Sequence, residues 1–337
     1  MATLSVTHPT LADVAKVKDP NGRIDGVAEI LNETNDILMD AVFLEGNLET
    51  GHRGTMRTGL PTPTWRKFNQ GVQSQKATTA QVVINCGMLE ALAEVDAELA
   101  ELGGNVNAFR AQQDRAFIEG MNQEFASTLF YGSEDTEPEA FTGFAPHYND
   151  LSATNAINII DAGGTGSDNQ SIYLVVWGPG KCNMRYPKAS KAGLMADDLG
   201  KYMSQTATDA DGNTNARMMV YGNHYKWKAG LYVEDWRYVV RICNIDRSLL
   251  TKDAASGADL VDLIAQALNL PPNLIGRPAL YCSREIMSFL DRQQSNKVAN
   301  ATLKMAQIYG EGPMALTARG VPIRRCDALD ADEARVT

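Results

Sequence analysis

The sequence predicts a mixed α+β fold in which helices and strands alternate along the chain. A Thr- and Val-rich stretch at 75–84 is β-prone, a regular stripe of large apolar residues marks a long helix over 107–131, and short helices and strands alternate after residue 251. The chain has 337 residues, of which 44% are hydrophobic and 21% charged. This is enough to bury a sizeable core, and the length suggests about two domains.

Composition and charge narrow the class of protein. The net charge of -10 argues against a dedicated nucleic-acid binder, which needs a basic face, but is compatible with a container whose wall does not adhere to DNA. The five cysteines are scattered and none forms a CxxC pair, which is typical of reduced thiols. The sequence shows neither a signal peptide nor a membrane-spanning apolar stretch, so we expect the chain to be made and folded in a cytoplasm.

The first part of the chain predicts a helix followed by an extended hairpin. Apolar residues recur at helical spacing from Ile24 to Ala41, which predicts an amphipathic helix ending before Gly46. Residues 50–89 contain no acidic residue and are interrupted at Pro61-Thr62-Pro63, which favours a long antiparallel hairpin. With arms of ~12–15 residues it would reach ~40–50 Å. A two-stranded ribbon of this kind is marginal alone, so we expect it to be stabilised on another chain.

Two helices are expected next. The first is predicted over 88–102, where Leu89, Leu92, Val95 and further leucines are spaced as in a helix. The second is predicted from Asn107, as its N-cap, to Tyr131.

The remaining elements are predominantly strands at first and then alternate with helices. We predict a strand at 171–177, a turn at 209–213, a long strand pair over 225–245, a helix over 260–268, a strand at 277–282, a helix capped by Ser283 and a strand at 321–325.

No motif supports catalysis, cofactor binding or metal binding. Gly163–Gly166 is followed by a strand and not by a helix N-terminus, so it lacks the geometry of a phosphate site. Asp209, Asp211 and Asn213 resemble a calcium loop, but the loop lacks the glutamate at its twelfth position. The four histidines are not arranged as HxxxH or HExxH, and no GxSxG sequence occurs. We therefore predict a protein that is not an enzyme.

The distribution of charge suggests a contact between subunits. Residues 50–89 carry a net charge of +5, whereas residues 90–139 carry twelve acidic residues against two arginines, a net charge of -10. Both segments could simply be solvated faces. We favour a hairpin that lies over the acidic block of a neighbouring subunit, where complementary charge would set the register. The predicted inter-subunit contacts are Arg53, Arg57, Arg66, Lys67 and Lys76 with Glu90, Glu94, Glu98 and Glu101.

The order of these elements resembles the major capsid proteins of tailed phages, which share the Hong Kong 97-type fold. The resemblance rests on the N-terminal arm, the extended loop that begins at Gly51-His52-Arg53, the long helix through Asp114–Asn122, the strand–helix pair Ala279–Leu290, and Gly320-Val321-Pro322-Ile323. It covers nearly the whole chain and is greatest to the capsid proteins of short-tailed phages.

The resemblance implies a domain organisation. It comprises an N-terminal arm (1–47), an extended loop (48–88), a peripheral domain (89–160 and 215–250) with a spine helix at 107–131, and an axial domain (161–214 and 251–337). Many relatives have a long strand after the Gly-x-Pro segment, whereas the longest strand predicted here, 227–242, lies earlier. A permuted order of elements would explain this difference.

The resemblance also implies the function. Subunits would form pentamers and hexamers of an icosahedral shell around double-stranded DNA, without sequence-specific contacts to it. The shell would be assembled in a bacterial cytoplasm with a scaffold, a portal and a cement protein as partners, and would become part of the virion. Three alternatives are an encapsulin-like compartment, a tail or adaptor protein, and a cytoplasmic hydrolase whose site is assembled in space.

Overall fold

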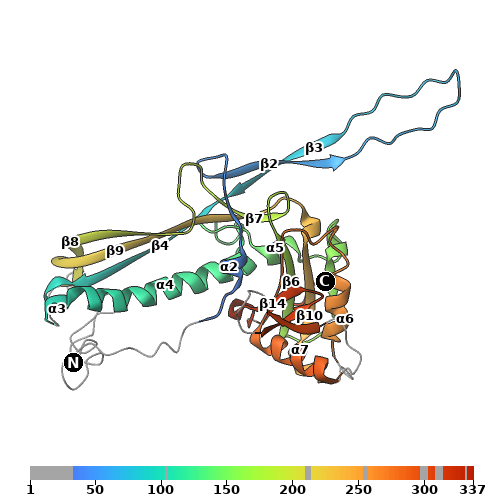
Figure 1. The fold of residues 1–337 in the computed structure, drawn as a ribbon. Helices are drawn as coiled ribbons and strands as arrows, with labels where there is room; N and C mark the ends of the chain where they lie inside the picture. The colour runs from blue at the N-terminus through green and yellow to red at the C-terminus, as the bar shows by residue number, and fades with distance from the viewer. Residues whose placement is uncertain are drawn as a thin grey trace. The chain divides into compact units, whose positions relative to one another are not determined.

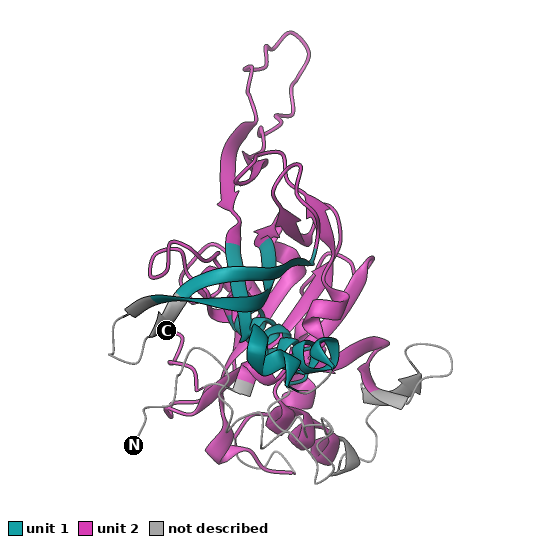
Figure 2. Ribbon diagram, turned by 90° about the vertical axis from the view of Figure 1, so that its left-hand side faces the viewer, with its two compact units in different colours: residues 1–35, 88–127, 193–228 teal, residues 36–87, 128–192, 229–337 magenta. Residues whose placement is uncertain are grey.

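The computed structural model describes residues 33–102, 105–208, 214–252, 257–296, 303–307, 314–330 and 332–337. The chain divides into two compact units, which are coloured separately in Figure 2. Unit 1 consists of residues 1–35, 88–127 and 193–228, and unit 2 consists of residues 36–87, 128–192 and 229–337.

Unit 1 is built from a long helix packed on one face of a sheet (Figure 1). Strand β9 (Thr214–Val233) lies between β8 (Leu194–Thr208) and β4 (Gly87–Asp96), and helix α4 (Val106–Tyr131) covers one face. Met121 of α4 packs between Ala93 and Tyr225, and the Phe125 ring stacks on Trp227 with 4.1 Å between ring centroids. Alternate residues of each strand face α4, and on β4 these are the apolar Leu89, Ala91 and Ala93.

The long helix predicted over 107–131 is confirmed. Helix α4 has 26 residues and is ~39 Å long at the usual helical rise. Its N-cap differs from the prediction, because the backbone N–H of Ala108 donates to Oδ1 of Asn105 at 3.1 Å. Asn105, and not Asn107, therefore stabilises the start of the helix.

The helix predicted over 88–102 is wrong for most of its length. Residues Gly87–Asp96 form strand β4, and only Ala97–Glu101 form a short helix, α3. The same residues also alternate, because Leu89, Ala91, Ala93 and Val95 lie two apart and face the core in clusters with α4 or β9. The alternation fits a strand that pairs with β9, and the helical interpretation did not take it into account.

Unit 2 is centred on β6 (Asn169–Trp177), all of whose residues are buried. Ile172 and Leu174 face the helices α6 (Leu260–Ala267) and α7 (Arg284–Asn296) in one core cluster. On the opposite face, Tyr173 lies 5.3 Å from Phe130, between ring centroids, and Trp177 contacts Phe144. Both faces are covered, which explains why β6 is apolar at consecutive positions.

The strand order in unit 2 is β12-β13-β14-β11-β6-β7, and the last residues of β9 pair with β7. Strand β10 also pairs with β6, β5 pairs with β10, and β1 pairs with β7. The remaining bounds are α2 Ile37–Asp40, α5 Phe144–His147, β1 Phe43–Glu45, β5 Ile159–Asp161, β7 Cys182–Tyr186, β10 Val239–Asp246, β11 Arg277–Cys282, β12 Leu303–Gln307, β13 Met314–Ala318 and β14 Val321–Arg325.

The predictions for the second half of the chain are mostly confirmed. The strands at 171–177, 277–282 and 321–325 and the helix over 260–268 are present. Ser283 caps α7, since its hydroxyl accepts a hydrogen bond from the backbone N–H of Ile286 at 3.2 Å. The predicted strand pair over 225–245 is wrong: β9 pairs with β8, and β10 pairs with β6. The turn at 209–213 lies outside the described residues.

The N-terminal helix predicted over 24–41 is only partly testable, because residues 24–32 lie outside the described residues. From residue 33 onward only Ile37–Asp40 is helical, so the prediction is wrong for residues 33–36. The apolar spacing does not predict the structure of this segment correctly, because polar contacts determine its conformation. Asp40 is buried, where it accepts hydrogen bonds from Tyr281 at 3.1 Å and from Arg324 at 3.2 Å.

The extended hairpin is confirmed. Strands β2 (Gly51–Gly59) and β3 (Thr78–Asn85) pair antiparallel, from Gly51 opposite Asn85 to Gly59 opposite Thr78. Residues 60–77, which connect the strands, are all exposed. Figure 1 shows the hairpin extending away from the remainder of unit 2.

Candidate assembly surfaces

The base of the hairpin is fixed to unit 2 by close packing. The His52 ring packs edge-on against Tyr232, with 4.9 Å between ring centroids. A Cβ atom added to Gly54 would lie 1.8 Å from the Tyr232 hydroxyl, so only glycine permits this approach. The Asn47 side chain accepts from the backbone N–H of Arg53 at 2.7 Å and donates to its carbonyl at 2.8 Å. These contacts hold the base of the hairpin and leave its far end projecting.

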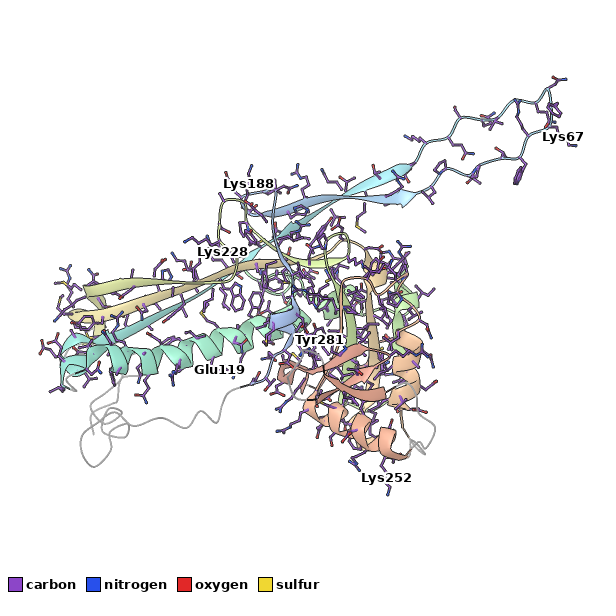
Figure 3. All side chains as sticks on the ribbon, in the orientation of Figure 1. Lys67, Glu119, Lys188, Lys228, Lys252 and Tyr281 are labelled. Atoms are coloured by element: carbon purple, nitrogen blue, oxygen red, sulfur yellow. The ribbon has the colours of Figure 1, made fainter. Side chains whose placement is uncertain are left out.

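The five cations predicted at the assembly surface all lie on this hairpin and are exposed: Arg53, Arg57, Arg66, Lys67 and Lys76. Within the part of the chain that the structure describes, none of them forms an ion pair. Figure 3 shows Lys67 at the far end of the hairpin. The hairpin therefore presents an uncompensated positive charge.

The four predicted acidic residues lie in unit 1 on β4 and α3. Glu90 approaches His224 at 3.1 Å, and Glu94 accepts hydrogen bonds from the Tyr202 and Ser204 hydroxyls at 2.5 and 3.0 Å. Both glutamates thus lie on the face of the sheet that points away from α4.

The remaining two lie on α3 and differ in their environment. Lys201 donates to Glu101 at 3.0 Å, and this hydrogen bond lowers the pKa of the Glu101 carboxyl. Glu98 is exposed, and its backbone N–H donates to Asp96. The ion pair with Lys201 therefore neutralises Glu101, whereas Glu98 remains exposed.

Exposed apolar side chains accompany these charges, and the sequence prediction did not identify them. Trp65 and Phe68 at the end of the hairpin are essentially fully exposed, and Met88 and Leu92 on the outer face of β4 are 56% and 46% exposed. The sequence contained a signal for the first pair, because two large aromatics flank Arg66-Lys67 in a loop with no apolar alternation. The exposure of Met88 and Leu92 was not predicted, because residues 88–102 were interpreted as a helix.

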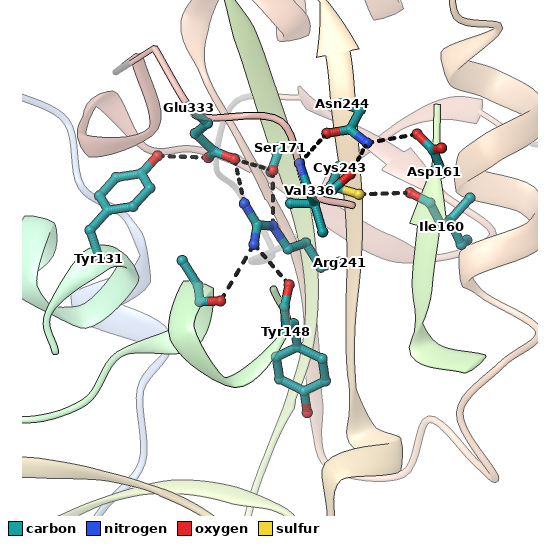
Figure 4. Close-up of polar contacts among 11 residues, drawn as sticks. Tyr131, Tyr148, Ile160, Asp161, Ser171, Arg241, Cys243, Asn244, Glu333 and Val336 are labelled. Atoms are coloured by element: carbon teal, nitrogen blue, oxygen red, sulfur yellow. Dashed lines mark hydrogen bonds and ion pairs between the residues drawn. The ribbon is translucent and has the colours of Figure 1, made fainter. Parts of the chain in front are cut away.

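A buried polar network lies within unit 2 (Figure 4). Arg241 donates to Glu333 at 2.6 Å, to the Ser171 hydroxyl at 3.1 Å and to the Tyr148 carbonyl at 2.8 Å. Tyr131 donates to the other Glu333 oxygen at 2.8 Å, and burial together with Glu333 raises the pKa of Tyr131. These hydrogen bonds connect strands β6 and β10 with the last turn of α4 and with the residues near 333.

The described residues contain no group of three or more His, Cys, Asp or Glu side chains placed to hold a metal ion. In the described part of the chain, no helix is both long enough and apolar enough to span a membrane. A cavity of about 240 Å³ next to the hairpin base is lined mainly by apolar side chains, among them Met56, Ile84 and Trp236.

Comparison with known proteins identifies the family. Residues 19–337 match the family model described as "Major capsid protein GP7". The capsid protein in the structure of bacteriophage Epsilon15 is 35% identical over 100% of both chains, with a TM-score of 0.77.

More distant solved structures are also similar. The capsid protein of bacteriophage JBD30 is 10% identical over 95% of this chain and 99% of that one, with a TM-score of 0.48. The SrpI encapsulin of Synechococcus elongatus PCC 7942 is 10% identical over 73% and 93%, with a TM-score of 0.40. A search of curated proteins found no match.

The α+β capsid fold of the Hong Kong 97 type, the role in the tailed-phage capsid and the place in the virion are therefore confirmed predictions. A shell protein associates with copies of itself, so the surfaces described above are candidates for that association. The chain belongs to the GP7 family of major capsid proteins.

Proposed function

We propose that this chain assembles as pentamers and hexamers into an icosahedral shell around double-stranded DNA, and that it has no catalytic role. The observation that carries the proposal is the hairpin, whose residues 60–77 are all exposed in the single chain. A two-stranded ribbon of this length is stable when it packs on another surface. A neighbouring subunit supplies that surface in a shell.

Charge complementarity supports the contact between neighbours. The cations of the hairpin lack ion pairs in the described chain, and the acidic residues of β4 and α3 are partly exposed. A single exposed ion pair contributes at most ~1 kcal/mol, so these pairs set register and association rate more than affinity. Glu98 is the best partner among them, because it is exposed whereas Lys201 already neutralises Glu101.

The two units suggest how the predicted domains divide. We assign unit 1, with α4 and the sheet of β4, β8 and β9, to the peripheral domain, and the β6-centred core of unit 2 to the axial domain. The hairpin remains the extended loop. This assignment moves β8 (Leu194–Thr208) into the peripheral domain and β10 (Val239–Asp246) into the axial domain, relative to boundaries drawn from the sequence.

Electron microscopy of the purified recombinant chain, with mass measured by light scattering, tests the proposal. Closed shells or rings of five and six subunits are expected. Nuclease-protected DNA in particles from infected cells supports a phage shell, whereas an encapsulated protein would indicate a compartment of the encapsulin type. Scaffold, portal and cement proteins are expected as additional partners, identified by mass spectrometry of immature particles. A uniform small oligomer, with or without those partners, contradicts the proposal.

Charge reversal tests the contact itself. Changing Arg53, Arg57, Arg66 and Lys67 to Glu is expected to block assembly without altering the circular dichroism of the subunit. The matched control reverses four exposed cations outside the hairpin: Lys188, Lys191, Lys252 and Arg277. Normal shells from the hairpin variant, or an equal defect in the control, would contradict the electrostatic contact.

A further inference from the structure

The far end of the hairpin presents two aromatic rings on a preformed turn. The backbone N–H of Gln70 donates to the Lys67 carbonyl at 3.3 Å, and Asn69 has a positive φ of 63°. Arg66 donates to the Gln70 carbonyl at 3.2 Å, which closes the turn from its other side. A short side-chain hydrogen bond of 2.5 Å from the Thr62 N–H to Gln75 joins the two arms behind it. These hydrogen bonds define the turn that carries the two rings.

Both aromatic rings on this turn are exposed to solvent. Trp65 and Phe68 flank Arg66-Lys67, and both side chains are essentially fully exposed. Burying either ring is worth roughly 1.5–3 kcal/mol or more in water, so leaving both exposed is costly unless a partner covers them. Trp and Arg are also the residues that most often dominate the free energy of protein interfaces.

A surface of matching character lies on the outer face of β4. Along this strand the outward residues are Met88, Glu90, Leu92 and Glu94, so apolar and acidic side chains alternate. Met88 and Leu92 are about half exposed, which shows that nothing in the single chain fully covers them. An aromatic and basic turn therefore has its complement in an apolar and acidic strand, whose side chains Met88 and Leu92 remain about half exposed.

We infer that Trp65 and Phe68 are the anchor of the assembly contact, and that they bind the Met88–Glu94 face of β4 in a second copy of this chain. The basic residues steer the hairpin to the acidic strand, and the aromatic pair holds it there. This inference rests on the proposed function, because it takes a second copy as the partner.

Site-specific cross-linking tests the position of the contact. Trp65 is replaced by the photoreactive p-benzoylphenylalanine, equal amounts of ¹⁵N-labelled and unlabelled subunits are assembled together, and cross-linked peptides are identified by mass spectrometry. Mixed-isotope peptides that join position 65 to residues 87–96 are expected. Cross-links confined to a single isotope, or directed mainly to another segment, would overturn the inference.

A pair of variants tests the energetic role. Trp65→Ser with Phe68→Ser is expected to raise the subunit concentration needed for assembly by about thirtyfold or more, the size of effect typical of a hot spot. The matched control, Ile157→Ser with Ile275→Ser, removes two similarly exposed apolar side chains from outside the hairpin and is expected to leave that concentration unchanged. Raising NaCl should weaken assembly of the double serine variant more than that of the wild-type chain, because only charge then holds the contact.

The outcomes separate this inference from the proposed function. If the wild-type chain forms shells and the double serine variant does so at the same concentration, the anchor is refuted while the shell function remains. If the wild-type chain forms no shell in any condition, the proposed function fails, and the inference fails with it.

Discussion

The buried ion pair between Arg241 and Glu333 provides the strongest stability prediction. The two side chains are only 4% and 5% exposed, and they approach to 2.6 Å. Glu333 also accepts hydrogen bonds from Tyr131 and Ser171. Changing Glu333 to Ala leaves the guanidinium buried without its counter-ion and removes the acceptor of two hydroxyl groups. Breaking a buried pair from one side costs roughly 3–5 kcal/mol, so we expect a loss of about 4 kcal/mol in the free energy of unfolding.

Urea denaturation of the unassembled subunit, followed by circular dichroism, measures this loss. Glu333→Gln keeps a hydrogen-bond acceptor but removes the charge, and it should cost about half as much. The double variant Arg241→Met with Glu333→Leu removes both charges, and it should recover only part of the stability, because the buried Tyr131 and Ser171 hydroxyls still lack their acceptor. Hydrogen exchange of the β6 and β10 amides should show the loss in unit 2, where the pair lies.

An exposed pair serves as the control. Lys201 and Glu101 are 37% and 46% exposed, so Glu101→Ala should cost at most about 1 kcal/mol. A cost for Glu333→Ala no larger than that of Glu101→Ala would refute the reasoning, since burial would then confer no special dependence on the partner charge.

Three further predictions concern single contacts. Gly54→Ala should speed limited proteolysis of the hairpin severalfold, because the new Cβ displaces Tyr232 from its contact with the hairpin base. The Cys86 thiol should react about a hundredfold more slowly at pH 8 than an ordinary thiol, because burial raises its pKa to about 11; its labelling rate should keep rising with pH until that value. Ser283→Ala should cost about 2 kcal/mol by urea denaturation, because the hydroxyl caps α7 and donates to buried Gln170.

Each of these has a control and a contrary result. Gly71→Ala adds a Cβ in open space on the same hairpin, so equal proteolysis of the two alanine variants would contradict the close contact at Gly54. Cys86→Ser should remove the labelling phase assigned to Cys86 and leave only the labelling of the four buried cysteines, and an unchanged phase would mean that another thiol reacts. Asn105→Ala removes an exposed cap at α4, and a cost equal to that of Ser283→Ala would show that burial adds nothing to the cap.

Local sequence patterns correctly predicted the elements whose structure depends mainly on residues close in sequence. Helix α4 was predictable because large apolar residues recur at spacings of four or eight from Phe109 to Leu129. Ser283 was predictable because a hydroxyl before an amphipathic segment is a strong start signal. The pairing of strands was not predictable. Residues 227–233 and 239–242 are both β-prone and close in sequence, yet Trp236–Tyr238 forms a 3-10 turn between them and each strand pairs with a distant partner. Pairing depends on long-range packing, which a local pattern does not contain.

The error at residues 88–96 matters most for function. Leu89, Leu92 and Val95 fit a helix, whereas Leu89, Ala91, Ala93 and Val95 fit a strand, and the small alanines made the second pattern weak. On a helix, Leu92 would lie in the core beside Leu89, and the acidic side chains would spread around the opposite surface. On the strand, Leu92 is exposed next to Glu90 and Glu94, while Ala93 is buried against α4. The start of the acidic block that the sequence indicated is therefore a row on β4 in which Glu90 and Glu94 alternate with Met88 and Leu92. A row of that kind can bind an aromatic and basic hairpin in one register, because a shift by one residue turns every contact side chain to the other face of the sheet.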